Sequence, residues 1–312
     1  MKSNRLSFGS LVVCVILLLV HMAFADPNAP SVPSLLPDDL VNVQYPSLEG
    51  LAPGSQEAQD RQRQAAQQLG LPVEVRTRVT GIVLRLIPAG TFMMGSPSNE
   101  SGRRDDEGPQ HQVTLTKPFY CGQFEVTQGQ WQQVMGSNPS YSTDAGPDAP
   151  VEQVSWDDCQ AFLNKLCEME GVSEGTYRLL TEAEWEYACR AGTMTAYCFG
   201  DSAVVLGDYA WYYGNSPNGT HPVDQKKPNA FGLHDMHGNV WEWCVDWSGE
   251  YLSEPQIDPL GPPSGVLHRV VRGGGWVSDA GGCRSADRGK GSLDDRDSDL
   301  GLRLARITPS YP

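Results

Sequence analysis

The chain has 312 residues, of which 23 are Lys or Arg and 38 are Asp or Glu, and its formal net charge at pH 7 is −15. Phosphate groups are bound by clustered basic side chains, so this acidity and the lack of a basic stripe argue against nucleic acid as a partner. An acidic surface of this kind favours solubility and attracts divalent cations.

The N-terminus has the composition of a secretory signal peptide. Lys2 and Arg5 precede the apolar run "LVVCVILLLV", and the small residues of "AFA" end at Ala25. This run is short for a membrane span, which needs about 20 residues, so cleavage is favoured over an uncleaved anchor. We expect residues 1–25 to be removed, which changes the net charge from −15 to −17. The mature chain is then secreted or periplasmic, without a membrane span.

Seven cysteines remain after this cleavage. Some are expected to pair in an oxidising compartment, and their odd number leaves at least one free thiol or a bond between chains. No CxxC motif occurs, so a structural zinc site has little support. The seven are Cys121, Cys159, Cys167, Cys189, Cys198, Cys244 and Cys283.

Residues 26–77 differ in texture from the rest of the mature chain. A Pro- and Ser-rich arm comes first. The polar stretch "SQEAQDRQRQAAQQLG" follows and favours a helix, either as a spacer or as a short surface helix. Strand-like runs with dense Gly, Trp and turn residues begin near Arg78. We therefore expect one domain over residues 78–308.

Three short helices are predicted from their capping residues. "TQGQWQQVMG" and "TEAEWEYACRAG" begin with Thr127 and Thr181, each followed three residues later by a Gln or Glu that completes a capping box. "SWDDCQAFLNKL" begins at Ser155 and has acids in its first turn. Gly136 and Gly192 are the expected ends of the first and last of these helices. Apolar residues at helical spacing indicate that all three are scaffold.

The turn-rich half after residue 192 is where a bound ion is expected. "LHDMHGNVWEWCVDW", residues 233–247, interleaves three tryptophans with acidic and amide residues around a Gly-Asn turn. A segment without long helices keeps its shape through hydrogen bonds, aromatic packing and bound ions. His234 and His237 also form a possible transition-metal pair, although a third zinc ligand is lacking.

Seven motifs follow one another along the chain: "FMMGS" at 92–96, "EVTQGQW" at 125–131, "PVEQVSWDDCQAF" at 150–162, "RLLTEAEWEYACRAGT" at 178–193, "PNAFGLHDMHGNVWEWCVDW" at 228–247, "RVVRGGGW" at 269–276 and "GLRLAR" at 301–306. In this order they resemble the formylglycine-generating enzyme, or sulfatase-modifying factor, family over about residues 82–306. The resemblance implies an irregular α+β fold, related to C-type lectins and poor in regular secondary structure.

The resemblance also implies structural calcium. In the opening stretch the ligands carried over by position are the Asp235 side chain and the carbonyls of Met236, Gly238 and Val240. Hard oxygen donors of this kind suit calcium, and Gly238 lets the backbone curl around the ion. The alternative is that Asp235 only caps a turn. A second calcium site of the family would use Asp208 and the Tyr209 carbonyl.

The best-known members of the family use copper and dioxygen to convert a sulfatase cysteine to formylglycine. Alignment on the RGG segment puts Ser278 and Cys283 at the family's two copper(I) cysteines, whereas alignment on "RSADR" leaves Cys283 outside the pair. At most one thiolate is then present, and a serine hydroxyl is a poor copper(I) ligand. Cys283 is a lone active-site thiol, a disulfide partner of Cys189 or Cys244, or a small buried residue. The resemblance places Trp241 beside the reacting centre.

The polar stretch "CRSADRGKGSLDDRDSDLGLRLAR" is the second candidate site. Arg284, Asp287 and Arg288 could line a mouth that binds a polar ligand. The alternative is a solvated network of ion pairs, which are common and individually weak.

Three functions follow from these features. The family implies an oxidase that acts on a sulfatase, with copper(I) as cofactor. The incomplete cysteine pair favours two alternatives: a copper-independent member that acts on another exported substrate, or a calcium-stabilised module that binds an exported protein or polar ligand without turnover.

Overall fold

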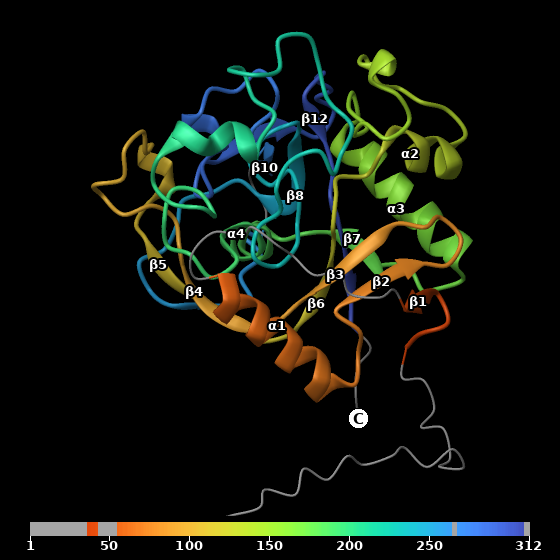
Figure 1. Ribbon diagram of the computed structural model, residues 1–312, viewed down its shortest axis with the longest axis horizontal. Helices are drawn as coiled ribbons and strands as arrows, with labels where there is room; N and C mark the ends of the chain where they lie inside the picture. The colour runs from red at the N-terminus through yellow and green to blue at the C-terminus, as the bar shows by residue number, and fades with distance from the viewer. Residues whose placement is uncertain (1–35, 43–54, 264–266, 309–312) are drawn as a thin grey trace, which may run out of the picture. The chain divides into compact units, whose positions relative to one another are not determined.

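The structure, a computed structural model, describes residues 36–42, 55–263 and 267–308 (Figure 1). The predicted signal peptide and most of the predicted arm lie outside the described residues. All described residues belong to the same unit of the chain. None of the helices in this part is both long and apolar enough to cross a bilayer.

The largest of three β-sheets has six strands, each antiparallel to its neighbours. In spatial order they are β1 (Leu40–Asn42), β2 (Glu74–Thr77), β3 (Val83–Ile87), β6 (Phe119–Gly122), β13 (Leu304–Ile307) and β7 (Tyr177–Leu179). Strand β13 comes from the end of the described chain but lies between β6 and β7, so the two ends of the domain meet in this sheet.

The two smaller sheets contain the strands of the turn-rich half other than β13, together with two strands from the first half of the chain. One has the order β11 (Gly289–Ser292), β10 (His268–Arg272), β8 (Trp241–Trp247) and β12 (Leu300–Gly301). The other has the order β4 (Gly90–Met94), β5 (His111–Leu115) and β9 (Gln256–Ile257). Strand β8 contains the tryptophan-rich stretch, so this part of the sequence forms a central strand.

All three predicted helices are present with the predicted caps. They are α2 (Gln128–Met135), α3 (Trp156–Glu170) and α4 (Glu182–Arg190), capped by Thr127, Ser155 and Thr181. Gly136 ends α2 in the left-handed conformation, as predicted. Helix α4 ends one residue before the predicted Gly192, because Ala191 takes the left-handed conformation with φ 44°.

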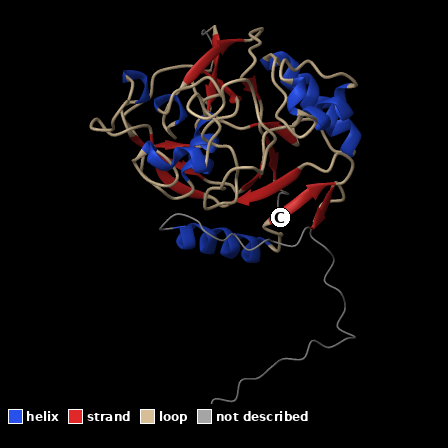
Figure 2. Cartoon of the chain, turned by 45° about the horizontal axis from the view of Figure 1, so that its top comes forward, coloured by secondary structure: helices blue, strands red, loops and turns tan. Residues whose placement is uncertain are grey.

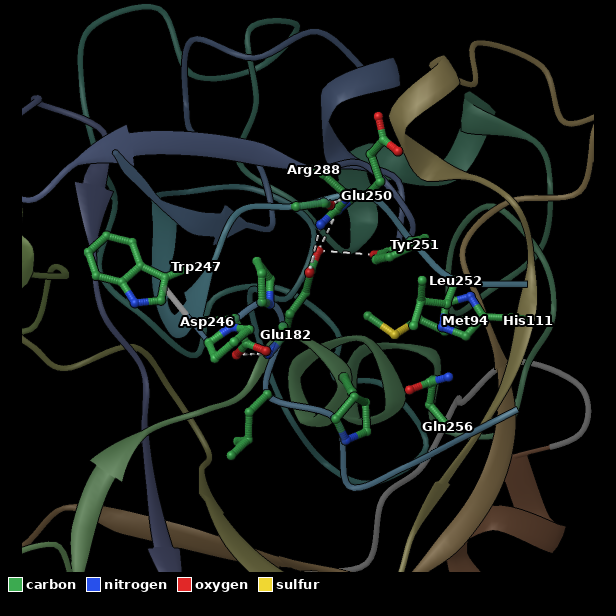
Figure 3. Close-up of a pocket in the computed structure, with 17 residues that line it drawn as sticks. Met94, His111, Glu182, Asp246, Trp247, Glu250, Tyr251, Leu252, Gln256 and Arg288 are labelled. Atoms are coloured by element: carbon green, nitrogen blue, oxygen red, sulfur yellow. Dashed lines mark hydrogen bonds and ion pairs between the residues drawn. The ribbon is translucent and has the colours of Figure 1, made fainter. Parts of the chain in front are cut away.

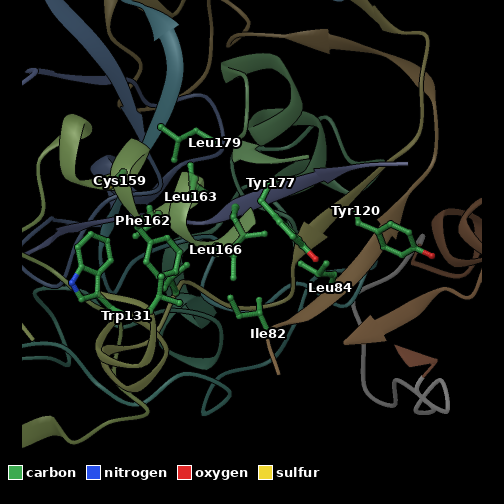
Figure 4. Packing of buried hydrophobic residues seen from close by; sticks show 14 of the residues in the cluster. Ile82, Leu84, Tyr120, Trp131, Cys159, Phe162, Leu163, Leu166, Tyr177 and Leu179 are labelled. Carbon is green, nitrogen blue, oxygen red and sulfur yellow. The ribbon is translucent and has the colours of Figure 1, made fainter. Parts of the chain in front are cut away.

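Helix α4 lies centrally and contacts β4, β8 and β10, so it joins the two smaller sheets (Figure 1). Helices α2 and α3 pack on each other, and α3 also packs on β7. Between them Trp131 and Phe162 stack with ring centroids 4.9 Å apart, within the main hydrophobic core (Figure 4). The strands of the two smaller sheets and helix α4 are therefore packed against one another beside a hydrophobic core.

Elements before Arg78 are part of this framework. Helix α1 (Ser55–Leu69) packs on β3, and its buried Gln62 donates hydrogen bonds to the carbonyls of Leu86 and Phe231 at 2.8 and 3.1 Å. Strands β1 and β2 belong to the six-stranded sheet. The predicted domain boundary at Arg78 thus falls between β2 and β3 of one sheet.

Loops and turns connect short elements throughout, as Figure 2 shows in tan. The predicted class, an α+β fold poor in regular secondary structure, agrees with this arrangement. Such loops need fixed hydrogen-bond partners, because buried backbone groups without partners are costly.

Asp39, next to β1, provides a test of how firmly the N-terminal strand is held. Its carboxylate pairs with Arg306 of β13 at 2.7 Å and accepts the Tyr177 hydroxyl at 2.6 Å. Burial raises the pKa of Asp39, but the hydrogen bonds from Arg306 and Tyr177 outweigh this and leave it below its ordinary value.

We expect Asp39→Asn to lower the free energy of unfolding by about 3 kcal/mol, because Arg306 stays buried without its counter-charge. Asp38→Ala, at an exposed neighbour, should have little effect. A lowered pKa contributes stability above the unfolded-state pKa, so the difference from wild type should shrink as pH falls below about 4. Urea unfolding at pH 7 and pH 3 measures this, and equal losses at both pH values would contradict it.

Candidate functional site

The predicted calcium loop is tightly wound at three positions. Asp235 and Asn239 have φ values of 59° and 67°, in the left-handed region that Asp and Asn tolerate best after Gly. Gly238 has φ 151°, and a Cβ there would lie 2.3 Å from the Trp211 carbonyl oxygen. Only glycine fits this close approach of two backbone segments.

Two buried carboxyl groups meet at this loop. Asp235 is 2% exposed, and its Oδ1 has no hydrogen-bond partner, while Oδ2 accepts the Asp224 N–H at 3.4 Å. Glu125, before α2, accepts hydrogen bonds from the Asn239 side chain and the Val240 N–H at 3.0 and 3.2 Å. An orphaned buried carboxylate oxygen beside a second carboxyl group has the chemistry of a cation site.

The raised pKa values of the two carboxyl groups also favour a cation at this loop. Burial raises the pKa of Asp235 to about 7, although the Arg303 charge opposes the shift. Burial and then the charge of Asp235 raise the pKa of Glu125 well above its ordinary value. The charge of Asp235 disfavours ionisation of Glu125, and a bound cation would relieve this.

Other groups of the loop are already engaged. The Met236 carbonyl accepts a weak S–H bond from Cys189 at 3.6 Å. His234 Nδ1 lies 2.9 Å from the Lys226 carbonyl oxygen. His237 Nδ1 lies 2.9 Å from the Cys283 carbonyl oxygen, and its Nε2 accepts the Cys198 N–H. No group of three or more His, Cys, Asp or Glu side chains in the described chain could hold a metal. The two histidines therefore give no support to a transition-metal pair.

The second predicted calcium site, at Asp208 and Tyr209, already has lysine ammonium groups beside it. Asp208, at the end of a 3-10 helix (η3, Ala203–Asp208), pairs with Lys227 at 2.8 Å and is half exposed. Lys226 Nζ donates to the Gly207 carbonyl at 2.6 Å and lies 3.6 Å from the centre of the Trp211 ring. Next to Asp208, the Tyr209 ring stacks on Phe199. Asp208 is neutralised by an ammonium group, unlike Asp235.

The segment at the family's copper position has no pair of thiols. Ser278 is partly buried and its hydroxyl accepts the Gly275 N–H at 3.0 Å, as part of a turn. Cys283 ends a 3-10 helix (η4, Gly281–Cys283) and is 0% exposed. Burial, then the charges of Asp287 and Asp279, raise the pKa of its thiol well above the ordinary range.

All seven described cysteines are buried free thiols. The expectation that some pair is not met, because the thiols are distributed over β6, α3, α4, β8 and the loops without forming a disulfide. Of the three interpretations of Cys283, a small buried residue agrees best. Cys189 and Cys244 are not bonded to it.

Trp241 is fixed through its backbone, and its ring packs near a glycine. Its backbone N–H donates to the Asp299 carbonyl at 2.7 Å, and its half-buried ring lies against Gly289. A Cβ at Gly275 would lie 2.4 Å from Asp299 Oδ2, so Gly275 makes room for this side chain. Burial and then Asp297 raise the pKa of Asp299 to about 6.

The predicted ligand mouth is closed. Arg284, Asp287 and Arg288 are all buried. Arg284 pairs with Glu107 and Glu100, which attaches η4 to the loop around residues 100–107. Burial raises the pKa of Asp287 to about 7. Arg284 and Asp287 form neither a polar mouth nor a solvated network, because their contacts are inside the domain, whereas Arg288 lines a cavity.

Sequence reasoning missed two features. One is Glu125, which begins the motif at 125–131 and whose carboxyl group faces the Asp235 loop. The other is a cavity around Asp246, lined also by Glu182 and Arg288 (Figure 3). An available signal was the alternation of Glu242, Cys244 and Asp246 along one strand, since all three face inward in β8.

These features define an irregular α+β domain in which buried ion pairs fix the loops. A family model described as the sulfatase-modifying factor enzyme 1-like domain matches residues 71–308, and the chain belongs to this family. A formylglycine-generating enzyme of Bos taurus is 30% identical over 286 residues, which cover 70% of this chain and 73% of the relative. The chaperone protein LppX of Paenibacillus barcinonensis is 32% identical over 241 residues, which cover 62% and 81%.

Two solved structures share the fold. Treponema denticola variable protein 1 aligns with a TM-score of 0.67 at 32% identity and covers 76% of this chain and 100% of that one. PvdO from Pseudomonas aeruginosa aligns with a TM-score of 0.67 at 30% identity and covers 75% and 98%. The predicted family and fold class are confirmed, and a C-type-lectin-like fold is consistent with both structures.

The burial of Cys283 leads to a direct chemical test. We expect the native protein to leave this thiol unmodified by iodoacetamide, because alkylation needs an accessible thiolate. The same reagent should modify it fully in guanidinium chloride without a reductant, since it is not in a disulfide. Mass spectrometry of the Cys283 peptide reads both outcomes. Rapid native alkylation, or protection that persists until reduction, would contradict the structure.

Proposed function

We propose that this protein is an exported member of its family that binds another exported molecule and does not oxidise a sulfatase cysteine with copper. The observation that carries the proposal is the pair of positions Ser278 and Cys283, one a hydroxyl and the other a fully buried, protonated thiol. Copper(I) requires soft thiolate ligands. Exchange with a substrate cysteine requires an accessible thiolate.

The relatives support a binding role as well as the oxidase role. Formylglycine-generating enzymes are one group of relatives, and a chaperone protein is another. Their names suggest two kinds of partner: a sulfatase, or an exported protein that needs assistance. Since the thiol chemistry of the first group is not supported by Cys283, we favour binding without turnover.

Export rests on the N-terminal sequence. A basic start, the apolar run and the small residues before Asp26 together support a cleavable signal peptide and a secreted or periplasmic mature chain. The strong net negative charge is compatible with such a location.

The oxidase reaction can be tested directly. We expect no formylglycine when the mature chain is incubated with copper(I), dioxygen and a sulfatase peptide containing Cys-x-Pro-x-Arg, and no tight one-to-one copper(I) complex. Mass spectrometry of the peptide and copper titration measure these outcomes, with a formylglycine-generating enzyme as the positive control. Product that is lost in Cys283→Ala would refute the proposal and assign that thiol to catalysis.

We further propose that the Asp235 loop binds one calcium ion. The orphaned Oδ1 of Asp235, the adjacent Glu125 carboxyl group and the tight turn at Gly238 support this. The carbonyls of Met236, Gly238 and Val240 are the further donors that the family resemblance suggests. At the Asp208 position the Lys227 ammonium group already balances the carboxylate, so one ion rather than two is proposed.

Calcium removal should destabilise the protein. We expect EGTA to lower the Tm relative to excess calcium, by an amount equivalent to about 2.7 kcal/mol when calcium is 100 times its Kd. Asp235→Ala should abolish this response, because it removes both side-chain oxygens, including the orphaned Oδ1. Asp208→Ala is the matched control and should keep the response. Scanning calorimetry measures all three proteins, and an unchanged wild-type Tm in EGTA would exclude the ion.

A further inference from the structure

A cavity of about 330 Å³ lies beside the first turn of α4, and none of its lining residues belongs to the loop 235–240. Residues 246, 247 and 249–252 form one part of its wall, and residues 259–263 form another (Figure 3). Met94 of β4, His111 of β5 and the start of α4 complete it. This volume is in the range of small-molecule sites. We call it the Asp246 cavity.

Asp246 is the distinctive polar group of this cavity. It is 3% exposed, and its Oδ2 accepts the Glu182 N–H at 2.8 Å. No Lys, Arg or His of the described chain forms an ion pair with it, as the salt bridges there show. Burial and the charge of Glu182 raise the pKa of Asp246 to about 8. A buried carboxyl group without a counter-charge has capacity for a cationic ligand.

The neighbouring carboxylate, Glu182, is by contrast fully compensated. Arg288 binds it through Nε and Nη2 at 2.6 and 2.9 Å, and the Tyr251 hydroxyl donates to it at 3.0 Å (Figure 3). The remaining Arg288 nitrogen donates to the carbonyls of Asp106 and Gly249. The arginine is thus committed to the protein and cannot attract an anionic ligand.

The walls around Asp246 are mainly apolar. They are formed by Met94, Leu252, Leu260, Pro259, Pro262 and Pro263. Glu250 adds a further negative charge at an exposed position of the rim. The N-terminus of α4 carries only a partial positive charge, and the Asp246 carboxyl group already accepts its N–H. Asp246 and Glu250 are therefore the acids of the cavity lining that have no ion pair within the described part of the chain.

We propose that the Asp246 cavity binds a small organic cation that has a primary ammonium group and a compact apolar body. The ammonium group donates to the Asp246 carboxylate, and the body lies against the prolines and leucines. A free amine and the lysine side chain of a bound peptide share this chemistry. An inorganic cation is disfavoured, because most of the wall offers carbon rather than oxygen.

The proposal is tested by isothermal titration of the full mature chain at pH 8. Benzylamine is the free-amine probe, benzyl alcohol is its neutral counterpart, and a blocked tripeptide with a central lysine represents a protein ligand. We expect benzylamine or the lysine peptide to bind at least about tenfold more tightly than benzyl alcohol, a difference of about 1.4 kcal/mol. The tighter of the two identifies the source of the amine.

Variants locate the site. Asp246→Asn keeps an acceptor for the helix N–H and should weaken binding of the better probe about thirtyfold or more. Glu254→Gln, at an exposed position that does not line the cavity, is the matched control and should change affinity less than about twofold, as is usual for an exposed charge. Leu260→Lys places a tethered ammonium group at a 66% exposed position of the wall and should also reduce binding without disturbing the fold.

Three results would overturn the proposal: equal affinities for benzylamine, the peptide and benzyl alcohol; no binding of any probe; or unchanged binding in the variants. If Asp246→Asn fails to fold, Leu260→Lys decides the question. The inference goes beyond the proposed function and is separable from it, because the copper and calcium experiments address other residues. Either proposal can fail while the other stands.

Discussion

The buried ion pair between Arg303 and Glu242 is the interaction on which the arrangement of the domain depends. Arg303 Nη2 lies 2.7 Å from Glu242 Oε1, and the same guanidinium group donates to the carbonyls of Gly122 and His234. Trp185 of α4 donates to the other Glu242 oxygen at 2.6 Å. One pair thus joins the six-stranded sheet, strand β8, helix α4 and the loop before Asp235. Removal of either charge would leave the other buried, which typically costs about 3–5 kcal/mol.

Similar buried ion pairs hold the loops in place where regular secondary structure is lacking. Arg272 bonds Glu186 of α4, and Arg284 bonds Glu107 across 177 residues of sequence. These guanidinium groups also donate to backbone carbonyls, which satisfies loop groups that no helix or sheet would satisfy. Residues 283–288 of the polar C-terminal stretch are therefore part of the interior, whereas residues 294–297 are exposed. Its charge density, which resembles a binding surface in the sequence, serves to fix the loops.

Local signals in the sequence predicted local structure well. Thr127, Ser155 and Thr181 cap the helices as expected, because a capping box involves only residues three apart. The inward direction of Cys283 and the Arg284–Glu107 pair depend on segments far apart in the chain, so spacing could not reveal them. The N-terminal arm was predicted as separate for the same reason: β1 has too few residues to be recognised without its partner β2.

The candidate sites show the same division. An acid in a tight turn made Asp235 predictable, whereas Glu125 comes from a distant segment, 114 positions before Asn239. Asp246 was visible as an acid in a tryptophan-rich strand, but its lack of a counter-charge appears only when the opposing loops are in place. The sequence shows which residues have the chemistry to bind a ligand. It does not show which of them lack an ion-pair partner in the folded domain.

The seven buried, unpaired thiols of the described residues determine how the protein would respond to an oxidant. Each thiol is protected only while the structure around it stays folded. The frequency of local unfolding therefore sets the rate at which the thiols are irreversibly oxidised. During folding the chain must enclose its sulfurs before stray cross-links form between them. Resistance of these thiols to an oxidant is then a kinetic property, set by how rarely the domain opens locally.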